Sequence, residues 1–192
     1  MIYFRLLLFL FASTFCFISW GQDTGYVNGY VVTIEGDTLT GLVKNKNMTP
    51  YRVLIDIKFK RDEKSKVETF SPDRLKGFRI GTKQYVSKEV HVHFGVERLF
   101  VEVIVDGHLS YYALEYTGFG AGNISEYVIL EKTNEKNQLV YDEHSVAINF
   151  KKKMAEYLKD APELVAKINN GTYTRKHVEA IVKEYNTLKS SL

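Results

Sequence analysis

Apolar and polar residues alternate along most of the chain between positions 26 and 141, with the two-residue period of β-strands. In residues 53–60, for example, valine, isoleucine and phenylalanine alternate with aspartate and lysine. This pattern predicts a half-buried antiparallel strand with one face in water. Turn residues such as Gly36-Asp37 and Pro72-Asp73 separate the alternating runs. We expect about 8–10 strands in an antiparallel sheet, a partly open barrel or a sandwich.

The clearest hairpin joins residues 99–105 to residues 108–116 through an Asp-Gly pair at 106–107. Asp-Gly suits a two-residue turn, because both turn positions need a positive φ angle. That turn predicts that Val103 lies opposite Ser110. Both faces of the hairpin carry apolar residues, so we expect it in the centre of its sheet.

Beyond Asn149 the apolar residues repeat every three to four positions, as on one face of a helix. Three short helices are expected, with Asp160 capping the start of the second and Thr174 the start of the third. A short helix with one apolar stripe is not stable alone, so these helices have to pack on each other or on the sheet. The expected fold class is therefore α+β, with the sheet followed by three C-terminal helices packed on it.

The first residues have the order of a secretory signal peptide. Arg5 gives a positive start, and residues 6–17 form an almost unbroken apolar run. Small residues follow at Ser19 and Gly21, which favours cleavage before Gln22. One alternative is a transmembrane anchor, but a span needs about 20 apolar residues and this run is shorter. The other is a lipoprotein anchored through Cys16, but Phe15 is large where lipoprotein processing needs a small residue.

Cleavage defines the expected organisation. Residues 1–21 are the signal, and residues 22–192 are one domain, with a β-rich part (22–147) and a helical part (148–192). The only cysteine, Cys16, leaves with the signal, so the stability of the domain has to come from core packing. We expect no transmembrane span in the processed protein. The expected location is the periplasm, the outer membrane or the extracellular space.

Composition and charge exclude several functions. The 26 Lys and Arg against 23 Asp and Glu give a net charge of only +3, and the sequence pI is about 8.7. This is below the usual footprint of a nucleic-acid-binding protein, so no nucleic-acid partner is expected. The chain also lacks the GxSxG motif of serine hydrolases, and its cysteine is not retained as a nucleophile.

Two histidines are the candidate metal ligands. His91 and His93 lie two residues apart, so on a strand both rings point to the same face. A third ligand would have to come from Glu89, His108 or His144, and no known spacing supplies it. The sequence therefore favours exposed histidines on an edge strand, with no cofactor. A metal-dependent hydrolase using this pair is the enzymatic alternative.

The aromatic residues provide the candidate contacts with a ligand or partner. The glycine-rich stretch at 118–123 lacks the GxGxxG spacing and is followed by no helix, so it predicts a hairpin loop rather than a phosphate cradle. Phe119 lies at the tip of that loop. Tyr111, Tyr112 and Tyr116 of the preceding strand are the other candidates, because loops and aromatic sheet surfaces often carry binding.

Two neighbouring segments resemble a known group of proteins. Residues 29–33 (GYVVT) and residues 36–41 (GDTLTG) are similar to the opening of small exported proteins of Bacteroidetes-type Gram-negative bacteria. The resemblance implies export and a comparable fold. It supplies no catalytic residues, since the group has no established activity.

Three functions follow as hypotheses. The first is a non-enzymatic envelope protein that binds another macromolecule through its sheet and helices. The second is a carrier for a small apolar ligand, with a cavity between sheet and helices. The third is the metal-dependent hydrolase. The absence of a catalytic motif favours the first.

Overall fold

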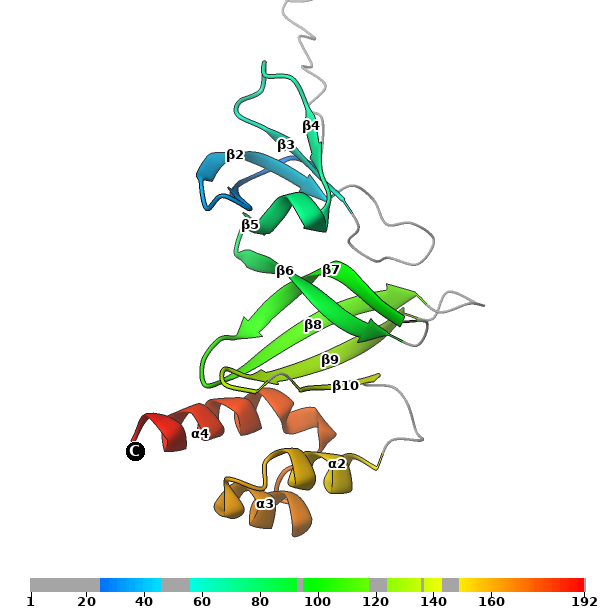
Figure 1. Ribbon diagram of the computed structural model, residues 1–192, viewed down its shortest axis with the longest axis vertical. Coiled ribbons are helices and arrows are strands. Elements are labelled where there is room, and N and C mark those ends of the chain that lie inside the picture. The colour runs from blue at the N-terminus through cyan, green and yellow to red at the C-terminus, as the bar shows by residue number, and fades with distance from the viewer. Residues whose placement is uncertain are drawn as a thin grey trace, which may run out of the picture.

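The computed structural model describes residues 25–45, 56–92, 95–117, 124–135, 137–142 and 149–191. Ten strands form a single antiparallel sheet in the order β10-β9-β8-β7-β6-β5-β1-β2-β3-β4, and the helices follow at the β10 end (Figure 1). The predicted α+β fold is therefore confirmed. No helix in the described part of the chain is long and apolar enough to cross a membrane.

The strands are β1 (Val27–Thr33), β2 (Thr38–Asn45), β3 (Ile57–Lys60), β4 (Glu68–Phe70), β5 (Leu75–Ile80), β6 (Lys83–Val92), β7 (Gly95–Val105), β8 (Leu109–Thr117), β9 (Ile124–Lys132) and β10 (Gln138–Asp142). The helices are α2 (Phe150–Tyr157), α3 (Pro162–Asn169) and α4 (Val178–Ser190), with short 3₁₀ turns η2 (Pro72–Arg74) and η3 (Arg175–His177). The predicted hairpin of β7 and β8 lies in the interior of the sheet, as its two apolar faces require.

The sheet buries one face along β1–β5 and both faces along β8–β10. Tyr85 and Phe100 belong to a core formed with β1–β5, whereas their neighbours Val86 and Val101 belong to a separate core formed with β8 and β9. The face that bears Tyr85 and Phe100 is termed the first face, and the face that bears Val86 and Val101 the second face. Consecutive strand residues point to opposite faces, so β6 and β7 contribute to both cores at once.

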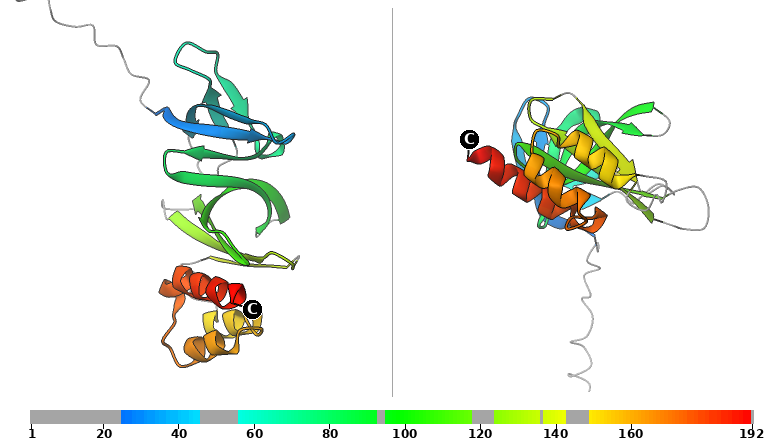
Figure 2. Two further views of the ribbon diagram at one scale, coloured as in Figure 1. Left: turned by 90° about the vertical axis from the view of Figure 1, so that its left-hand side faces the viewer. Right: turned by 90° about the horizontal axis from the view of Figure 1, so that it is seen from below.

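Strands β6 to β10 curl toward the second face. The Gln138 side-chain amide on β10 donates a hydrogen bond to the Glu89 carbonyl on β6 at 3.2 Å, although three strands separate them in the sheet. Lys88 and Glu131 form an ion pair at 2.7 Å across the same curl. Figure 2 shows the strong curvature of β6 and β7. The curl encloses the second face at this end of the sheet, whereas along β5, β1, β2 and β3 the second face is the one opposite the core.

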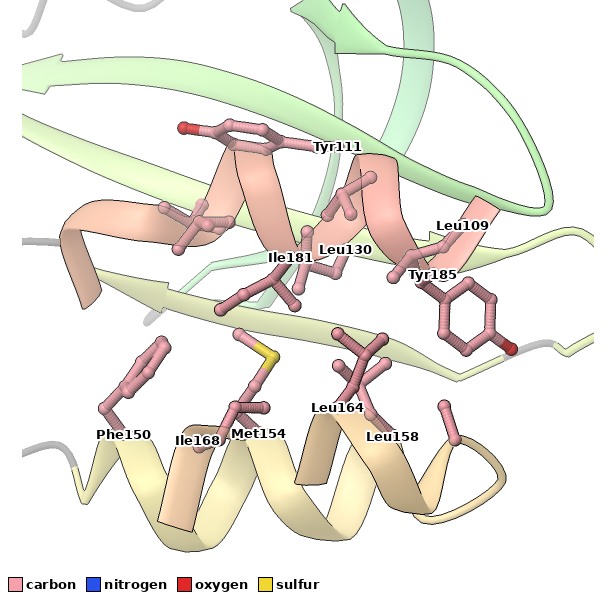
Figure 3. Packing of buried hydrophobic residues seen from close by; sticks show 14 of the residues in the cluster. Leu109, Tyr111, Leu130, Phe150, Met154, Leu158, Leu164, Ile168, Ile181 and Tyr185 are labelled. Carbon is pink, nitrogen blue, oxygen red and sulfur yellow. The ribbon is translucent and has the colours of Figure 1, made fainter. Parts of the chain in front are cut away.

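The helices cover the first face of β8–β10. The largest core cluster joins Leu109 and Leu130 of the sheet to Met154, Leu164 and Ile181 of the three helices, all at 0% exposure (Figure 3). Helix α4 lies against β7 and β8, and α3 contacts both α2 and α4. The apolar stripes predicted for the three helices are thus the surfaces that they bury.

The structure corrects the predicted hairpin register. Val103 pairs with Tyr112 rather than Ser110, and the ladder shifts between Val103 and Val105. The turn extends through His108 instead of containing two residues, because β8 begins only at Leu109. The error at Val103 is two residues, an even number, so Val103 and Tyr112 still share the predicted face, whereas beyond the shift Val105 pairs with Tyr111 and packs on the opposite, helix-covered face.

The longer turn fits against helix α4. The Asn186 side chain accepts a hydrogen bond from the Leu109 N–H at 2.7 Å and donates one to the Leu109 carbonyl at 2.9 Å. A Cβ atom at Gly107 would lie 2.5 Å from the Asn186 amide nitrogen. Asn186 therefore continues the hydrogen-bond pattern of the sheet and holds α4 in position.

Replacing Asn186 with alanine is expected to lower the free energy of unfolding by about 1–3 kcal/mol, because it leaves a partly buried backbone N–H and C=O without partners. Chemical denaturation measures the change. Asn169→Ala at the exposed end of α3 is the matched control and should change stability by less than about 0.5 kcal/mol. Equal losses in the two variants would contradict the role assigned to Asn186.

Candidate functional site

The predicted aromatic contacts do not form one surface among the described residues. Tyr111 and Tyr112 follow each other in β8, point to opposite faces and are 9% and 7% exposed. Tyr111 packs against the helices, and Lys88 lies 4.7 Å from the centre of the Tyr112 ring inside the curl. Both tyrosines are therefore core residues. Phe119 and the side chain of Tyr116 lie outside the described residues.

Only one of the two candidate metal ligands is described. His91 lies near the end of β6 with an exposed side chain, and His93 lies outside the described residues. Within the described segments, no three His, Cys, Asp or Glu side chains come together in a way that could hold a metal ion.

Register places a group of cations on the second face of β5, β1, β2 and β3. Lys44 lies directly opposite Lys58, and Lys60 lies opposite Leu42 one row away. In the next row Tyr30 lies between Arg79 and Thr40. These positions alternate with the core residues of the first face, which are Val31, Val43, Phe59 and Phe78. The group consisting of Lys44, Lys58, Lys60, Arg79, Tyr26 and Tyr30 is termed the basic face.

The basic face combines like charges with aromatic rings. The Lys60 ammonium lies 4.0 Å from the centre of the Tyr26 ring, and that of Lys44 lies 5.3 Å from it. Both distances are in the range of cation–π attraction. Lys44 and Lys58 carry like charges directly opposite each other, and such charges repel in a sheet.

Arg79 is exposed and the other members of the basic face are half-buried. The Arg79 Nε atom donates to the Gly81 carbonyl at 2.8 Å, which fixes the base of its side chain at the end of β5. Asp56 precedes β3 and is the nearest carboxylate in sequence to Lys58. The four cations of the face lie on three strands, β5, β2 and β3.

A second charged cluster lies where the β9–β10 turn meets the helices. The side chain of Lys132 is only 8% exposed, and its ammonium contacts Asp160 at 2.8 Å and Glu135 at 3.1 Å. The Tyr185 hydroxyl donates to Asp160 at 2.6 Å, and Lys189 contacts the same carboxylate at 2.9 Å. Hollows of about 260 and 360 Å³ flank Lys132, which lines both of them.

The cluster fixes the charge state of its members. Burial alone would raise the pKa of Asp160, but hydrogen bonds from Lys132, Tyr185 and Lys189 outweigh burial and hold the pKa well below its ordinary value of 3.8. Burial raises the pKa of Tyr157 to about 12. Burial and the Asp160 carboxylate raise the pKa of Tyr185 above its ordinary value of 10.0. At neutral pH two ammonium groups face two carboxylates and two neutral phenols, so the cluster neutralises its own charges.

The Lys132 cluster and the basic face differ in their position and in what they connect. Around Lys132 the charges are paired, and they join β9, the segment before α3 and helix α4, which is the arrangement of a structural clamp. On the basic face, Lys58 and Arg79 lie opposite the core on strands β3 and β5, which the helices do not cover (Figure 1). The basic face is therefore the candidate functional site.

No protein family, curated protein or solved structure matches this chain in sequence or fold comparisons. The candidate site consequently rests on its own geometry and charge.

Proposed function

We propose that this protein is an exported, non-enzymatic module of the cell envelope that binds an anionic partner through the basic face. The observation that carries the proposal is the direct opposition of Lys44 and Lys58 on a sheet face that also holds Lys60 and Arg79. Cations grouped on one face of a sheet favour association with a partner of complementary, negative charge.

The packing between sheet and helices is consistent with a binding module. In the described residues, the space between α4 and the sheet is filled by side chains such as Leu109, Leu130 and Ile181, which have no exposed surface (Figure 3). Export is proposed from the charged, apolar and small-residue order of residues 1–21.

A single experiment in living cells tests location and binding together. The protein carries a C-terminal tag and a photo-reactive amino acid in place of Arg79 or, as a control, in place of Lys152, which is exposed on α2. We expect the protein in the envelope fraction with Gln22 as its first residue. We also expect ultraviolet light to produce a cross-linked adduct from position 79 and none from position 152.

Two results would contradict the proposal. Protein that stays in the cytosol with Met1 in place is not exported. Adducts of equal yield from both positions would mean that the basic face does not direct binding.

A further inference from the structure

We propose that the paired ends of β6 and β7 form a lid over the second face of β8 and β9, and that a polar clasp holds this lid closed. The lid consists of residues 88–92 of β6 and 95–99 of β7, which pair with each other in register. This inference goes beyond the proposed function and does not depend on the basic face. Three features of the sheet support it: the positions where strand pairing ends, the surface beneath the lid and the contacts that fasten it.

No other strand pairs with the lid on either side within the described residues. Pairing of β6 with β5 ends at Val86, and pairing of β7 with β8 reaches only to Glu102, one register row away. The row next to the lid is fixed in place. Ser87 donates a hydrogen bond to the Pro72 carbonyl at 2.7 Å, and Phe100 has 0% exposure in the first-face core. The lid can therefore turn about this row as a two-stranded unit, with every strand ladder intact.

The lid buries one of its own faces. Val90 and Leu99 are 0% and 4% exposed and belong to the second-face core together with Leu114 of β8 and Ile129 of β9. On the other face of the lid, Val96 is 54% exposed. The strong curvature of β6 and β7 in Figure 2 brings the buried face onto β8 and β9. Opening the lid would therefore give solvent and ligands access to an apolar surface that is closed in this structure.

The contacts that fasten the lid to β9 and β10 are polar. The Lys88 ammonium contacts Glu131 at 2.7 Å, and the Gln138 amide donates to Glu131 at 2.8 Å and to the Glu89 carbonyl at 3.2 Å. The Gln138 amide oxygen is buried and accepts no hydrogen bond from the part of the chain that the structure describes. A buried polar atom without a partner raises the free energy of the closed state. The lid is therefore the part of this sheet that we expect to open first.

Two adjacent residues of β9 distinguish lid opening from unfolding of the whole protein. Ile129 and Leu130 both have 0% exposure, but Ile129 lies in the second-face core and Leu130 in the core under the helices. Ile129 pairs with Tyr112, whose ring centre lies 4.7 Å from the Lys88 ammonium, so Ile129 is beneath the lid. Opening of the lid exposes position 129 alone, whereas global unfolding exposes both positions.

The test measures how fast a thiol reagent labels a cysteine at each position under native conditions. Ile129→Cys and Leu130→Cys are prepared separately, and peptide mass separates the introduced thiol from Cys16, the only cysteine of the chain. Each rate is divided by the rate for the same variant in urea, which corrects for intrinsic reactivity. We expect labelling at position 129 to be at least about tenfold faster than at position 130, because local opening requires less free energy than global unfolding.

Two further substitutions test the clasp in the Ile129→Cys protein. K88Q removes the cation of the clasp, whereas the control K83Q removes a similarly short pair, Lys83 with Glu102 at 2.8 Å, from the part of β6 outside the lid. We expect K88Q to increase the labelling rate at position 129 roughly fivefold or more and K83Q to change it less than about twofold. Neither should change the rate at position 130. Circular dichroism and melting temperature confirm that each variant is folded.

Three results would overturn the inference. Equal rates at positions 129 and 130 would mean that only global unfolding exposes the second face. Faster labelling at position 130 would mean that the helices open and the lid does not. Equal effects of K88Q and K83Q would mean that the contacts of Lys88 do not hold the lid closed.

Discussion

Replacing Phe78 with alanine is expected to lower the free energy of unfolding by about 3–5 kcal/mol, the range measured for large aromatic side chains in cores. Phe78 is 1% exposed, and its ring stacks on Tyr85 with 4.6 Å between ring centres. It also meets Phe100 edge-on at 5.0 Å. Three strands, β5, β6 and β7, contribute to this contact, so the cavity left by alanine cannot close by the movement of one side chain.

Urea denaturation followed by circular dichroism measures the effect, with two controls. Phe78→Leu keeps most of the volume and should cost less than half as much as alanine. Val96→Ala removes methyl groups from a side chain that is 54% exposed and should stay within about 0.5 kcal/mol of the parent. A loss below about 1 kcal/mol for Phe78→Ala would mean that the ring is not central to this core.

The same region lies directly behind the basic face. Phe78 and Arg79 are neighbours on β5 and point to opposite faces, as do Phe59 and Lys58 on β3. Burial of the two phenylalanines therefore determines the side on which the cations are exposed. A variant that loosens this core should therefore disturb the basic face as well as lower the stability of the protein.

Hydrophobic periodicity predicts the elements of this fold well, because local sequence determines it. The alternation in residues 53–60 predicted a wet face that includes Lys58 and Lys60, and within the described part of this stretch the structure places both opposite the core. The three apolar stripes after Asn149 likewise mark the surfaces that the helices bury. Each pattern depends only on residues that are close together in the sequence.

The composition of the basic face was beyond sequence analysis, because it depends on pairing between distant segments. Lys58 meets Lys44 only through the β2–β3 register, and Arg79 joins them only because β5 pairs with β1. The sequence predicts that each of these residues lies on a solvent-facing strand surface. It does not predict that they lie close to one another. The curl of β6–β10 also depends on pairing between distant segments, since it places Gln138 against Glu89.

Asp160 shows how a tertiary contact overrides a local preference. Its position before Pro162 predicted a helix cap, and that prediction is wrong. Ala161 occupies the N-cap position of α3 with no side-chain cap, while the Asp160 carboxylate binds Lys132 and Lys189 instead. Lys132 and Lys189 are each almost thirty residues away, and a nearly buried ammonium needs an anionic partner more than an exposed helix end needs a cap.

Replacing Asp160 with asparagine is expected to lower the free energy of unfolding at pH 7 by about 2 kcal/mol. Removing one partner of a fully buried ion pair costs about 3–5 kcal/mol, because the other charge stays buried. The cost here is smaller because the side chain of Asp160 is 37% exposed and Glu135 still contacts Lys132. Glu179→Gln breaks the exposed pair with Lys183 and is the control, with an expected change below about 0.5 kcal/mol.

The effect should depend on pH in a defined direction. The hydrogen bonds to Asp160 hold its pKa in the folded protein below the ordinary value of 3.8, so the folded state binds this proton less readily than the unfolded state. The stabilisation is complete above pH 3.8 and is lost as the pH falls toward the lower pKa of the folded protein. The difference in unfolding free energy between the parent and Asp160→Asn should therefore be constant from about pH 5 to 7 and shrink below about pH 4. Carboxylates outside this cluster have the same surroundings in both proteins, so their contributions cancel in this difference. A difference that stays constant down to pH 2 would show that the charge of Asp160 is not its source.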